Sequence, residues 1–350
     1  MLAKRRCVGI LCSLLLLTGC TSQVPESKPI TAETDLFAMD TFMTMKAYGP
    51  GADTLLTEVG KQILALEHSL SVTEPDSDIG RLNRAKGQTT TVTADTIAIL
   101  ETAITLGDLT NGALDVSIYP VVAAWGFTTG QNQIPSPDTI ADLLPHVDYS
   151  QIRLTSNTVT LPAEMQIDLG SLAKGYTGDV AAKHLRKGGV TSALLNLGGN
   201  VHIIGAKTDG TPWKVAIADP FAPEQNMLVL AVTDAVVITS GNYERYFMGE
   251  DGVRYCHIID SHTGYPADNG IVSMTIVGDS TKENAGLRCD GLSTALYVSG
   301  EQQAKELWRT EGDFEMVYVT VDGQIHMTEG LMEICTNVSA YPVEVLYAEE

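Results

Sequence analysis

One segment of the chain combines an acidic residue, glycines and a lysine in a pattern that suits an anion. Between Ile167 and Gly205, Asp168 is followed by small residues, Lys174 and a helical pattern. Glycines at a strand-to-helix junction let a ligand approach the backbone, and the free N–H groups of the helix favour an anion. Lys174 in the first turn would oppose the helix dipole unless an anion were bound nearby. The segment is equally compatible with a phosphate site and with an ordinary strand–turn–helix whose lysine faces solvent.

A second segment, DGLSTAL, offers oxygen ligands for a hard cation. Asp290 and Thr294 are four residues apart, so a helix would place both on one face. A carboxylate and a hydroxyl, completed by phosphate oxygens and water, would suit Mg²⁺. The alternative is an acidic residue that favours the first turn of a helix, next to a buried threonine.

A histidine could supply acid–base chemistry. His257 stands in the apolar run YCHIID, where strand alternation would place it on the same face as Tyr255 and Ile259. The ordinary pKa of histidine makes it a candidate base for removing a hydroxyl proton. A lone histidine in such a run is also often a structural core residue. His262, in the following turn, is predicted to be solvated, and the other histidines have no comparable setting.

These residues need a scaffold of mixed helices and strands. Apolar periodicity predicts a helix after Lys174 and others over Asp53–Leu70, Thr93–Thr110 and Leu287–Ser299. Ser71–Gly87 is predicted to be a polar loop, and Asp115 to lie in a loop beside apolar sequence. Strands are predicted over Phe37–Tyr48, Ile152–Leu161, Trp213–Ala218, Met227–Val232, Val236–Ser240, Tyr255–Asp260, Ile271–Val277, Phe314–Val321 and Gln324–Thr328. Because strands and helices do not alternate regularly, we predict an α+β fold.

The N-terminus is predicted to be a bacterial lipoprotein signal. Basic residues precede a short apolar run from Val8 to Leu17, and Leu17–Cys20 matches the lipidation pattern. The run is too short for a stable membrane-spanning helix. We expect residues 1–20 to act as the signal, Cys20 to carry the lipid, residues 21–34 to be a flexible tether and residues 35–350 to form the domain. The domain would then face the extracytoplasmic side of the cell membrane.

Composition narrows the choice of partners. The chain carries 22 basic and 43 acidic residues, and its net charge of −21 argues against binding to nucleic acid. Beyond the N-terminal region the cysteines are Cys256, Cys289 and Cys335. An odd number of cysteines without CxxC spacing argues against a disulfide framework or a structural zinc site, so all are expected to be free thiols.

A series of motifs in one order resembles the ApbE family. The motifs are MDT (39–41), PDSDIGRLN (75–83), ALD (113–115), DLGSLAKGY (168–176), NLGGN (196–200), SGNYERYF (240–247), HIIDSHTGYP (257–266) and DGLSTAL (290–296). The resemblance implies a T-fold-like α+β architecture with FAD bound between subdomains. It also implies Mg²⁺-dependent transfer of FMN from FAD to a threonine or serine hydroxyl of an acceptor flavoprotein, with release of AMP. Members of the family are often membrane-tethered lipoproteins.

The resemblance also implies roles for individual residues in binding FAD. Asp168 is expected at the adenosine portion, Lys174 at the phosphates, and Ile259 to contribute backbone contacts. The full expected FAD-binding set is Met39, Ala113, Leu114, Asp115, Asp168, Lys174 and Ile259.

The resemblance places Mg²⁺ between the backbone carbonyl of Ser171 and the side chains of Asp290 and Thr294, and it makes His257 the expected base. Phosphoryl transfer depends on charge neutralisation, in-line placement and activation of the hydroxyl. Lys174 and Mg²⁺ would neutralise the pyrophosphate, and His257 would accept the proton of the incoming hydroxyl.

The chain departs from the family pattern at three places. Thr73 stands where a tyrosine often stacks on the cofactor, and Asp40 replaces the usual glycine after Met39. The segment between Asp279 and Asp290 is longer than is common, which could remodel the edge of the metal site.

Two other functions fit parts of the same pattern. A Mg²⁺-dependent FAD pyrophosphatase would use the same metal and phosphate groups, with water in place of the acceptor hydroxyl. A non-catalytic flavin-binding lipoprotein would need no base, so the combination of His257, Lys174, Asp290 and Thr294 argues against it.

Overall fold

The computed structural model describes residues 31–349, so the predicted signal, Cys20 and most of the predicted tether lie outside the described residues. Strand β1 (Thr31–Ala38) already begins within the range predicted as tether, and it pairs along its whole length with β2 (Thr41–Tyr48). Among residues 31–349, no helix has the length and apolar character needed to cross a membrane.

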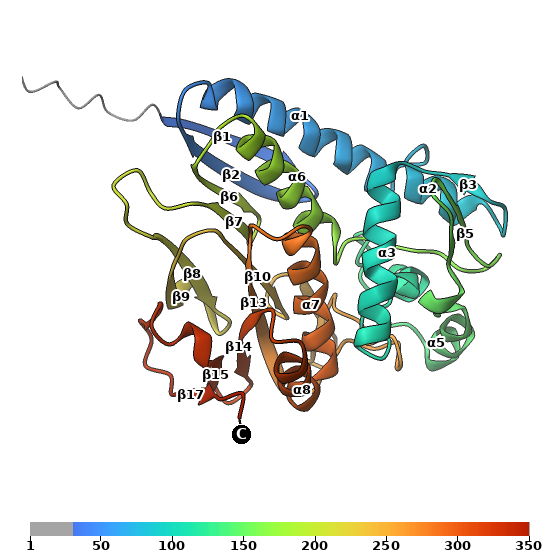
Figure 1. The fold of residues 1–350 in the computed structure, drawn as a ribbon. Coiled ribbons are helices and arrows are strands. Elements are labelled where there is room, and N and C mark those ends of the chain that lie inside the picture. The colour runs from blue at the N-terminus through green and yellow to red at the C-terminus, as the bar shows by residue number, and fades with distance from the viewer. Residues whose placement is uncertain (1–30, 350) are drawn as a thin grey trace, which may run out of the picture.

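A nine-stranded sheet forms the centre of the molecule (Figure 1). Its strands run in the order β1, β2, β6 (Ser192–Leu197), β7 (Asn200–Ile204), β10 (Ala235–Gly241), β13 (Ile271–Asp279), β14 (Glu315–Thr320), β15 (Ile325–Thr328) and β17 (Val343–Leu346). Neighbouring strands are antiparallel, except that β15 and β17 are parallel. The predicted α+β class is therefore confirmed, because a doubly wound fold would need a mostly parallel sheet.

Helices cover one face of this sheet (Figure 1). They are α1 (Ala52–Leu70), α6 (Ala173–Lys187), α7 (Ala285–Ser299) and α8 (Glu301–Glu311), with α3 (Ala94–Leu109) packed against α7. Helix α1 illustrates why a helix packs on the sheet. Its residues Leu56, Val59, Ile63 and Leu66 recur at helical spacing and are all buried, so they form one apolar side of the helix.

A small sheet covers the other face. It contains β8 (Trp213–Asp219), β9 (Ala222–Val232) and β16 (Cys335–Asn337). In β10, Val237 packs into the core beneath this small sheet, while Ile238 packs into the helical core on the opposite side. Strands that are buried on both faces need continuous apolar sequence, which explains the Val- and Ile-rich runs.

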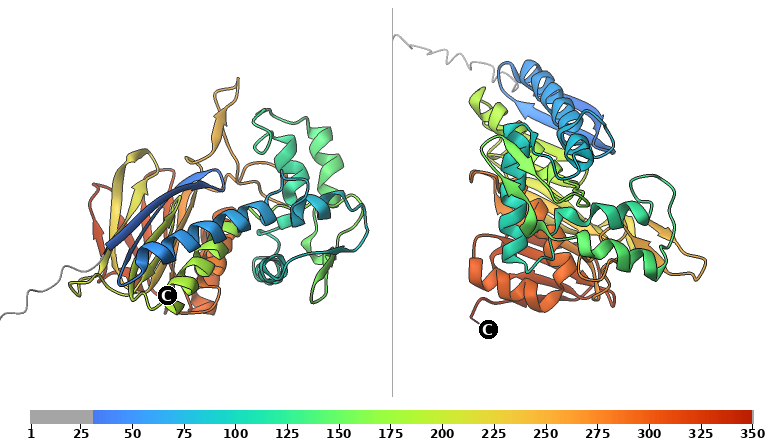
Figure 2. Two further views of the ribbon diagram at one scale, coloured as in Figure 1. Left: turned by 90° about the horizontal axis from the view of Figure 1, so that it is seen from above. Right: turned by 90° about the vertical axis from the view of Figure 1, so that its right-hand side faces the viewer.

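A second lobe projects beside α3, and a hairpin stands next to it (Figure 2). The lobe contains α2 (Asp78–Arg84), α4 (Tyr119–Ala124), α5 (Pro137–Leu143) and a sheet of β3 (Thr90–Thr91), β5 (Thr158–Thr160) and β4 (Arg153–Leu154). The hairpin pairs β11 (Tyr246–Met248) with β12 (Arg254–Cys256).

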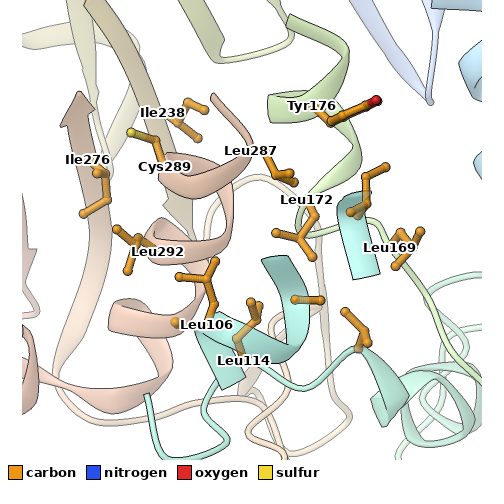
Figure 3. Close-up of a cluster of buried hydrophobic side chains, with 14 of the residues drawn as sticks. Leu106, Leu114, Leu169, Leu172, Tyr176, Ile238, Ile276, Leu287, Cys289 and Leu292 are labelled. Atoms are coloured by element: carbon orange, nitrogen blue, oxygen red, sulfur yellow. The ribbon is translucent and has the colours of Figure 1, made fainter. Parts of the chain in front are cut away.

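The main core joins the lobe to the sheet helices. Leucines from α3, the loop after it, the segment before α6 and α7 meet there, including Leu106, Leu114, Leu172 and Leu292 (Figure 3). A Cβ atom on Gly291 would lie 2.4 Å from the Leu106 side chain, so this glycine lets α7 approach the others closely. The same elements carry the residues predicted to act in the site.

Several sequence predictions need correction. The strand predicted over Phe37–Tyr48 is a hairpin, because Met39 and Asp40 adopt φ values of 50° and 56° and reverse the chain. The loop predicted over Ser71–Gly87 contains helix α2, which Ser77 caps by accepting a hydrogen bond from the Gly80 N–H at 2.7 Å. The strand predicted over Tyr255–Asp260 ends at Cys256.

Candidate active site

A cavity of about 950 Å³ lies between the β1–β2 turn, the end of α1, the lobe, the start of α6 and helix α7. All the site residues predicted from the sequence line this one cavity: Met39, Ala113, Leu114, Asp115, Asp168, Ser171, Lys174, His257, Ile259, Asp290 and Thr294. Segments far apart in the sequence are thus brought together, while the role of each residue stays a prediction.

Asp168 and Lys174 flank the start of α6. The Asp168 carboxylate accepts a hydrogen bond from the Gly170 N–H at 2.9 Å, which shapes the turn into the helix. Burial raises the pKa of Asp168, and the Gly170 and Leu169 N–H groups and the charge of Arg245 counteract this rise. Lys174 lies in the first turn of α6 and faces the same cavity.

The Asp290 side chain caps the start of α6. Gly175 is the third residue of this helix, so its N–H is one of the first backbone donors that have no partner within the helix. Here it donates to Oδ2 of Asp290 on α7 at 2.8 Å. Ser171 lines the cavity, and within residues 31–349 no backbone N–H donates to its carbonyl oxygen.

Neighbouring hydroxyl groups also leave the lone pairs of the Thr294 oxygen free. The Ser293 hydroxyl donates to the Asp290 carbonyl at 2.8 Å, so its oxygen accepts from Ser240 at 2.8 Å. Because the Ser240 proton is then used, the 3.3 Å contact between Ser240 and Thr294 requires Thr294 to donate. The Thr294 oxygen can therefore accept or ligate on its cavity side.

These donors fit the Mg²⁺ expected from the sequence. The Asp290 side chain is only 4% exposed; burial raises its pKa, and the charge of Lys174 acts in the opposite direction. A carboxylate, a carbonyl and a hydroxyl are oxygen ligands of the kind that hard cations prefer. Among the described residues, no cluster of three or more His, Cys, Asp or Glu side chains could hold a metal. A carboxylate, a carbonyl and a hydroxyl, completed by phosphate oxygens and water, would suit Mg²⁺.

The ring of His257 is set up as a neutral base. Burial, together with the nearby charges of Arg245 and Lys174, lowers the pKa of His257 to about 4. Its Nδ1 lies 3.1 Å from the Arg245 carbonyl oxygen. Because a carbonyl only accepts, Nδ1 must carry the proton, which leaves the Nε2 lone pair free.

Asp115 and Met39 each take part in hydrogen bonds with backbone N–H groups that shape the wall of the cavity. The Asp115 carboxylate accepts from the Ser117 N–H at 2.8 Å, the Ser117 hydroxyl at 2.6 Å and the Tyr149 N–H at 3.1 Å. It therefore fixes the Ala113–Asp115 turn against the cavity. The Met39 N–H donates to Glu67 of α1 at 2.6 Å, which holds the β1–β2 turn at the cavity rim.

Charged residues that were not predicted as site residues also line the cavity, Glu244 and Arg245 among them. Glu244 and Arg245 follow β10 and line the cavity beside His257. Desolvation by the surrounding protein raises the pKa of Glu244 and the charge of Lys174 counteracts this rise, although the residue as a whole is exposed. The SGNYERYF motif contains both residues, but nothing in its spacing indicates which side chains face a ligand.

Two of the departures from the family pattern, Thr73 and Asp40, line the cavity. Thr73 lines the cavity, where its hydroxyl contacts the Ser71 hydroxyl at 3.0 Å. Asp40 pairs with Arg245 at 3.3 Å, and both side chains are largely exposed. This exposed pair ties the β1–β2 turn to the loop that leads into β11.

The model of the ApbE family matches residues 39–318, which is most of the chain. The chain belongs to the ApbE family. Among curated proteins, it is 33% identical to the FAD:protein FMN transferase of Vibrio cholerae over 306 residues, covering 84% of this chain and 87% of that protein. It is 31% identical to the FAD:protein FMN transferase of Treponema pallidum over 296 residues, covering 79% and 80% of the two chains.

Solved ApbE structures share the fold. The flavin transferase ApbE from Vibrio cholerae matches with a TM-score of 0.78 and 27% identity, covering 88% of this chain and all of that chain. The ApbE protein from Thermotoga maritima matches with a TM-score of 0.80 and 27% identity, covering 87% and 99%. The lobe and the layered sheet of this chain are therefore features of the ApbE family.

Proposed function

We propose that this protein transfers FMN from FAD to an acceptor protein. The observation that carries this proposal is the convergence of the ApbE motifs on one cavity that presents Lys174, His257 and Asp290 together. Membership of the ApbE family and the names of the curated relatives support the same activity.

The cavity contains groups for each part of the reaction. Lys174 would bind the pyrophosphate, and Asp168 the adenosine portion of FAD. Asp290, Thr294 and the Ser171 carbonyl would hold Mg²⁺, which neutralises charge on the phosphates when it is bound. The free Nε2 of His257 would accept the proton of the incoming hydroxyl.

The bond changes balance without a further reactant. The acceptor hydroxyl, which we propose belongs to a threonine or serine, attacks the phosphorus of the FMN portion. A phosphoester forms, the P–O–P bridge breaks, and the bridging oxygen leaves with AMP. The proton taken by His257 can then pass to the departing phosphate or to water.

The location of the reaction is also part of the proposal. The predicted lipidation at Cys20 would anchor the protein to the cell membrane with the cavity on the extracytoplasmic side. This part of the proposal is supported by the lipoprotein pattern of the N-terminus alone.

A mass measurement tests the activity. The protein is incubated with FAD, MgCl₂ and candidate acceptor proteins, and intact masses are compared for the wild type and Asp290→Ala. We expect the acceptor to gain one FMN with the wild type and to stay unmodified with Asp290→Ala. Transfer that survives unchanged in Asp290→Ala would overturn the metal assignment.

The same experiment separates the two alternatives. Free FMN and AMP without a modified acceptor would identify a pyrophosphatase. FAD that stays bound and intact in the presence of Mg²⁺ and acceptors would identify a flavin-binding protein without catalysis. The lone pair left free on His257 favours transfer over simple binding, because a binder has no use for a base.

A further inference from the structure

Helices α6 and α7 are joined by two carboxylates, one on each helix, that accept backbone N–H groups of the other helix. Asp290 of α7 accepts from the Gly175 N–H of α6 at 2.8 Å. Asp179 of α6 accepts from the Gly286 N–H through one oxygen and from the Leu287 N–H through the other, both at 2.8 Å. Each helix therefore binds backbone N–H groups of its neighbour.

Asp179 takes the place of a cap at the start of α7. The first N–H groups of a helix have no partner within that helix. The residue before α7, Asn284, provides no side-chain hydrogen bond to them. A side chain from another helix thus satisfies them, and it fixes the position of α7 relative to α6 as well as its first turn.

Glycines allow the two helices to touch. A Cβ atom on Gly175 would lie 2.2 Å from the Gly286 carbonyl oxygen and 2.6 Å from Cβ of Asp290. Neither contact leaves room for a side chain, so the helices pack backbone to backbone at the level of Asp290.

His202 of β7 supports this contact from the sheet side. Its side chain is fully buried, and its Nε2 lies 3.4 Å from Oδ1 of Asp179. Cβ atoms added to Gly178 or Gly286 would come within 2.0 Å and 2.1 Å of its ring. The ring therefore fills the space that these glycines leave and limits the movement of Asp179.

We propose that Asp179 is a positioning residue for the Mg²⁺ ligands. It does not line the cavity, but it holds the first turn of α7 against α6, and Asp290 follows one turn later. It thereby sets the distance between the Asp290 carboxylate on α7 and the Ser171 carbonyl just before α6. The His202 ring, packed beside Asp179, limits the space into which this carboxylate could move. The inference rests on the proposed Mg²⁺-dependent function.

Titration of MgCl₂ into FAD-saturated protein by isothermal calorimetry tests this inference without measuring activity. We expect Asp179→Asn to weaken Mg²⁺ binding by about 10-fold, the lower end of the loss caused by changing groups that orient metal ligands, because Asp179 acts on Asp290 through the first turn of α7. Asp234→Asn is the matched control. Asp234 also accepts a backbone N–H, from Gly205 at 2.8 Å, and contacts Arg186 of α6 at 3.1 Å, but it lies outside the cavity. Its variant should bind Mg²⁺ as the wild type does.

The outcomes separate the inference from the function on which it rests. A wild-type protein that binds FAD but no Mg²⁺ overturns the metal site and this inference together. A folded Asp179→Asn with wild-type Mg²⁺ affinity overturns the inference alone. If Asp179→Asn does not fold, His202→Gln replaces it, with a smaller loss of Mg²⁺ affinity expected. Unchanged affinity in folded His202→Gln then overturns the inference.

Discussion

At the scale of single residues, the hydrogen bond between His257 and the Arg245 carbonyl decides what the histidine can do. It fixes the proton on Nδ1 and leaves the lone pair of Nε2 free on a residue that lines the cavity. A glutamine at this position fills similar space but cannot take a proton. We expect His257→Gln to slow transfer by roughly two to four powers of ten while FAD binding stays unchanged. Single-turnover transfer and FAD titration measure the two effects, and a parallel loss of FAD affinity would point to a binding role instead.

The lowered pKa of His257 predicts how the transfer activity should change with pH. The base must be neutral to act, and burial together with Arg245 and Lys174 lowers its pKa to about 4. Activity that depends on this group should persist as the pH falls below the ordinary histidine value and decline only towards pH 4. The measurement is kcat/KM as a function of pH, because it reports groups of the free enzyme. In His257→Gln this decline should disappear. A decline centred at or above the ordinary histidine pKa would contradict the assignment.

At the scale of elements, Asp78 joins helix α2 to the start of α3. Its buried carboxylate accepts from the Thr93 N–H at 2.7 Å, the Thr93 hydroxyl at 2.8 Å and the Thr96 hydroxyl at 2.7 Å. Burial alone would raise its pKa, but these bonds and Arg81 outweigh it and lower the pKa. This stabilisation is therefore present at neutral pH and is lost as the pH falls through the lowered pKa.

Replacing Asp78 should loosen the lobe that forms one wall of the cavity. We expect Asp78→Ala to lower the free energy of unfolding by about 2–4 kcal/mol, because buried donors lose their acceptor. Urea denaturation at neutral pH measures the change. Asp76→Ala removes an exposed carboxylate two residues away and should stay within about 0.5 kcal/mol of the wild type. Equal stability of the two variants would show that Asp78 does not tie α2 to α3.

Elements with strong periodicity were predictable from the sequence, and elements defined by tertiary contacts were not. The helices over Asp53–Leu70 and Leu287–Ser299 are confirmed by α1 and α7 within two residues at each end. Helix α2 was missed because Asp, Ser and Pro before it are typical of turns, and its helix depends on the Ser77 cap and the bonds to Asp78. The turn at Met39–Asp40 was missed because methionine rarely adopts a positive φ and no glycine marks the turn.

The sequence was sufficient to predict several residues that line the cavity, but not the contacts that hold them in place. Lys174 and Asp290 stand out by residue type, whereas the α6–α7 contact through Asp179 involves a long separation in the chain. Glu244 and Arg245 have no distinctive spacing, and only the fold brings them beside His257.

At the scale of the whole molecule, the cavity lies between the lobe and the sheet helices, so a ligand that fills it must contact both. A ligand that binds only the folded state raises the free energy of unfolding by about 2.7 kcal/mol at a hundred times its Kd. We therefore expect saturating FAD to raise the melting temperature of the entire domain in a single transition. A rise confined to one of two separate transitions would show that the lobe and the sheet unfold independently.

Mg²⁺ should strengthen this effect only when FAD is present. The protein offers Asp290, Thr294 and the Ser171 carbonyl, and the phosphates of FAD would complete the ligand set. Since binding linkage is reciprocal, Mg²⁺ should tighten FAD binding by the same factor as FAD tightens Mg²⁺ binding. Differential scanning fluorimetry with each ligand alone and with both should give a combined shift larger than the sum. In Asp290→Asn the extra shift should vanish while the shift from FAD alone remains. A Mg²⁺ shift of equal size without FAD would place the cation at a site independent of the pyrophosphate.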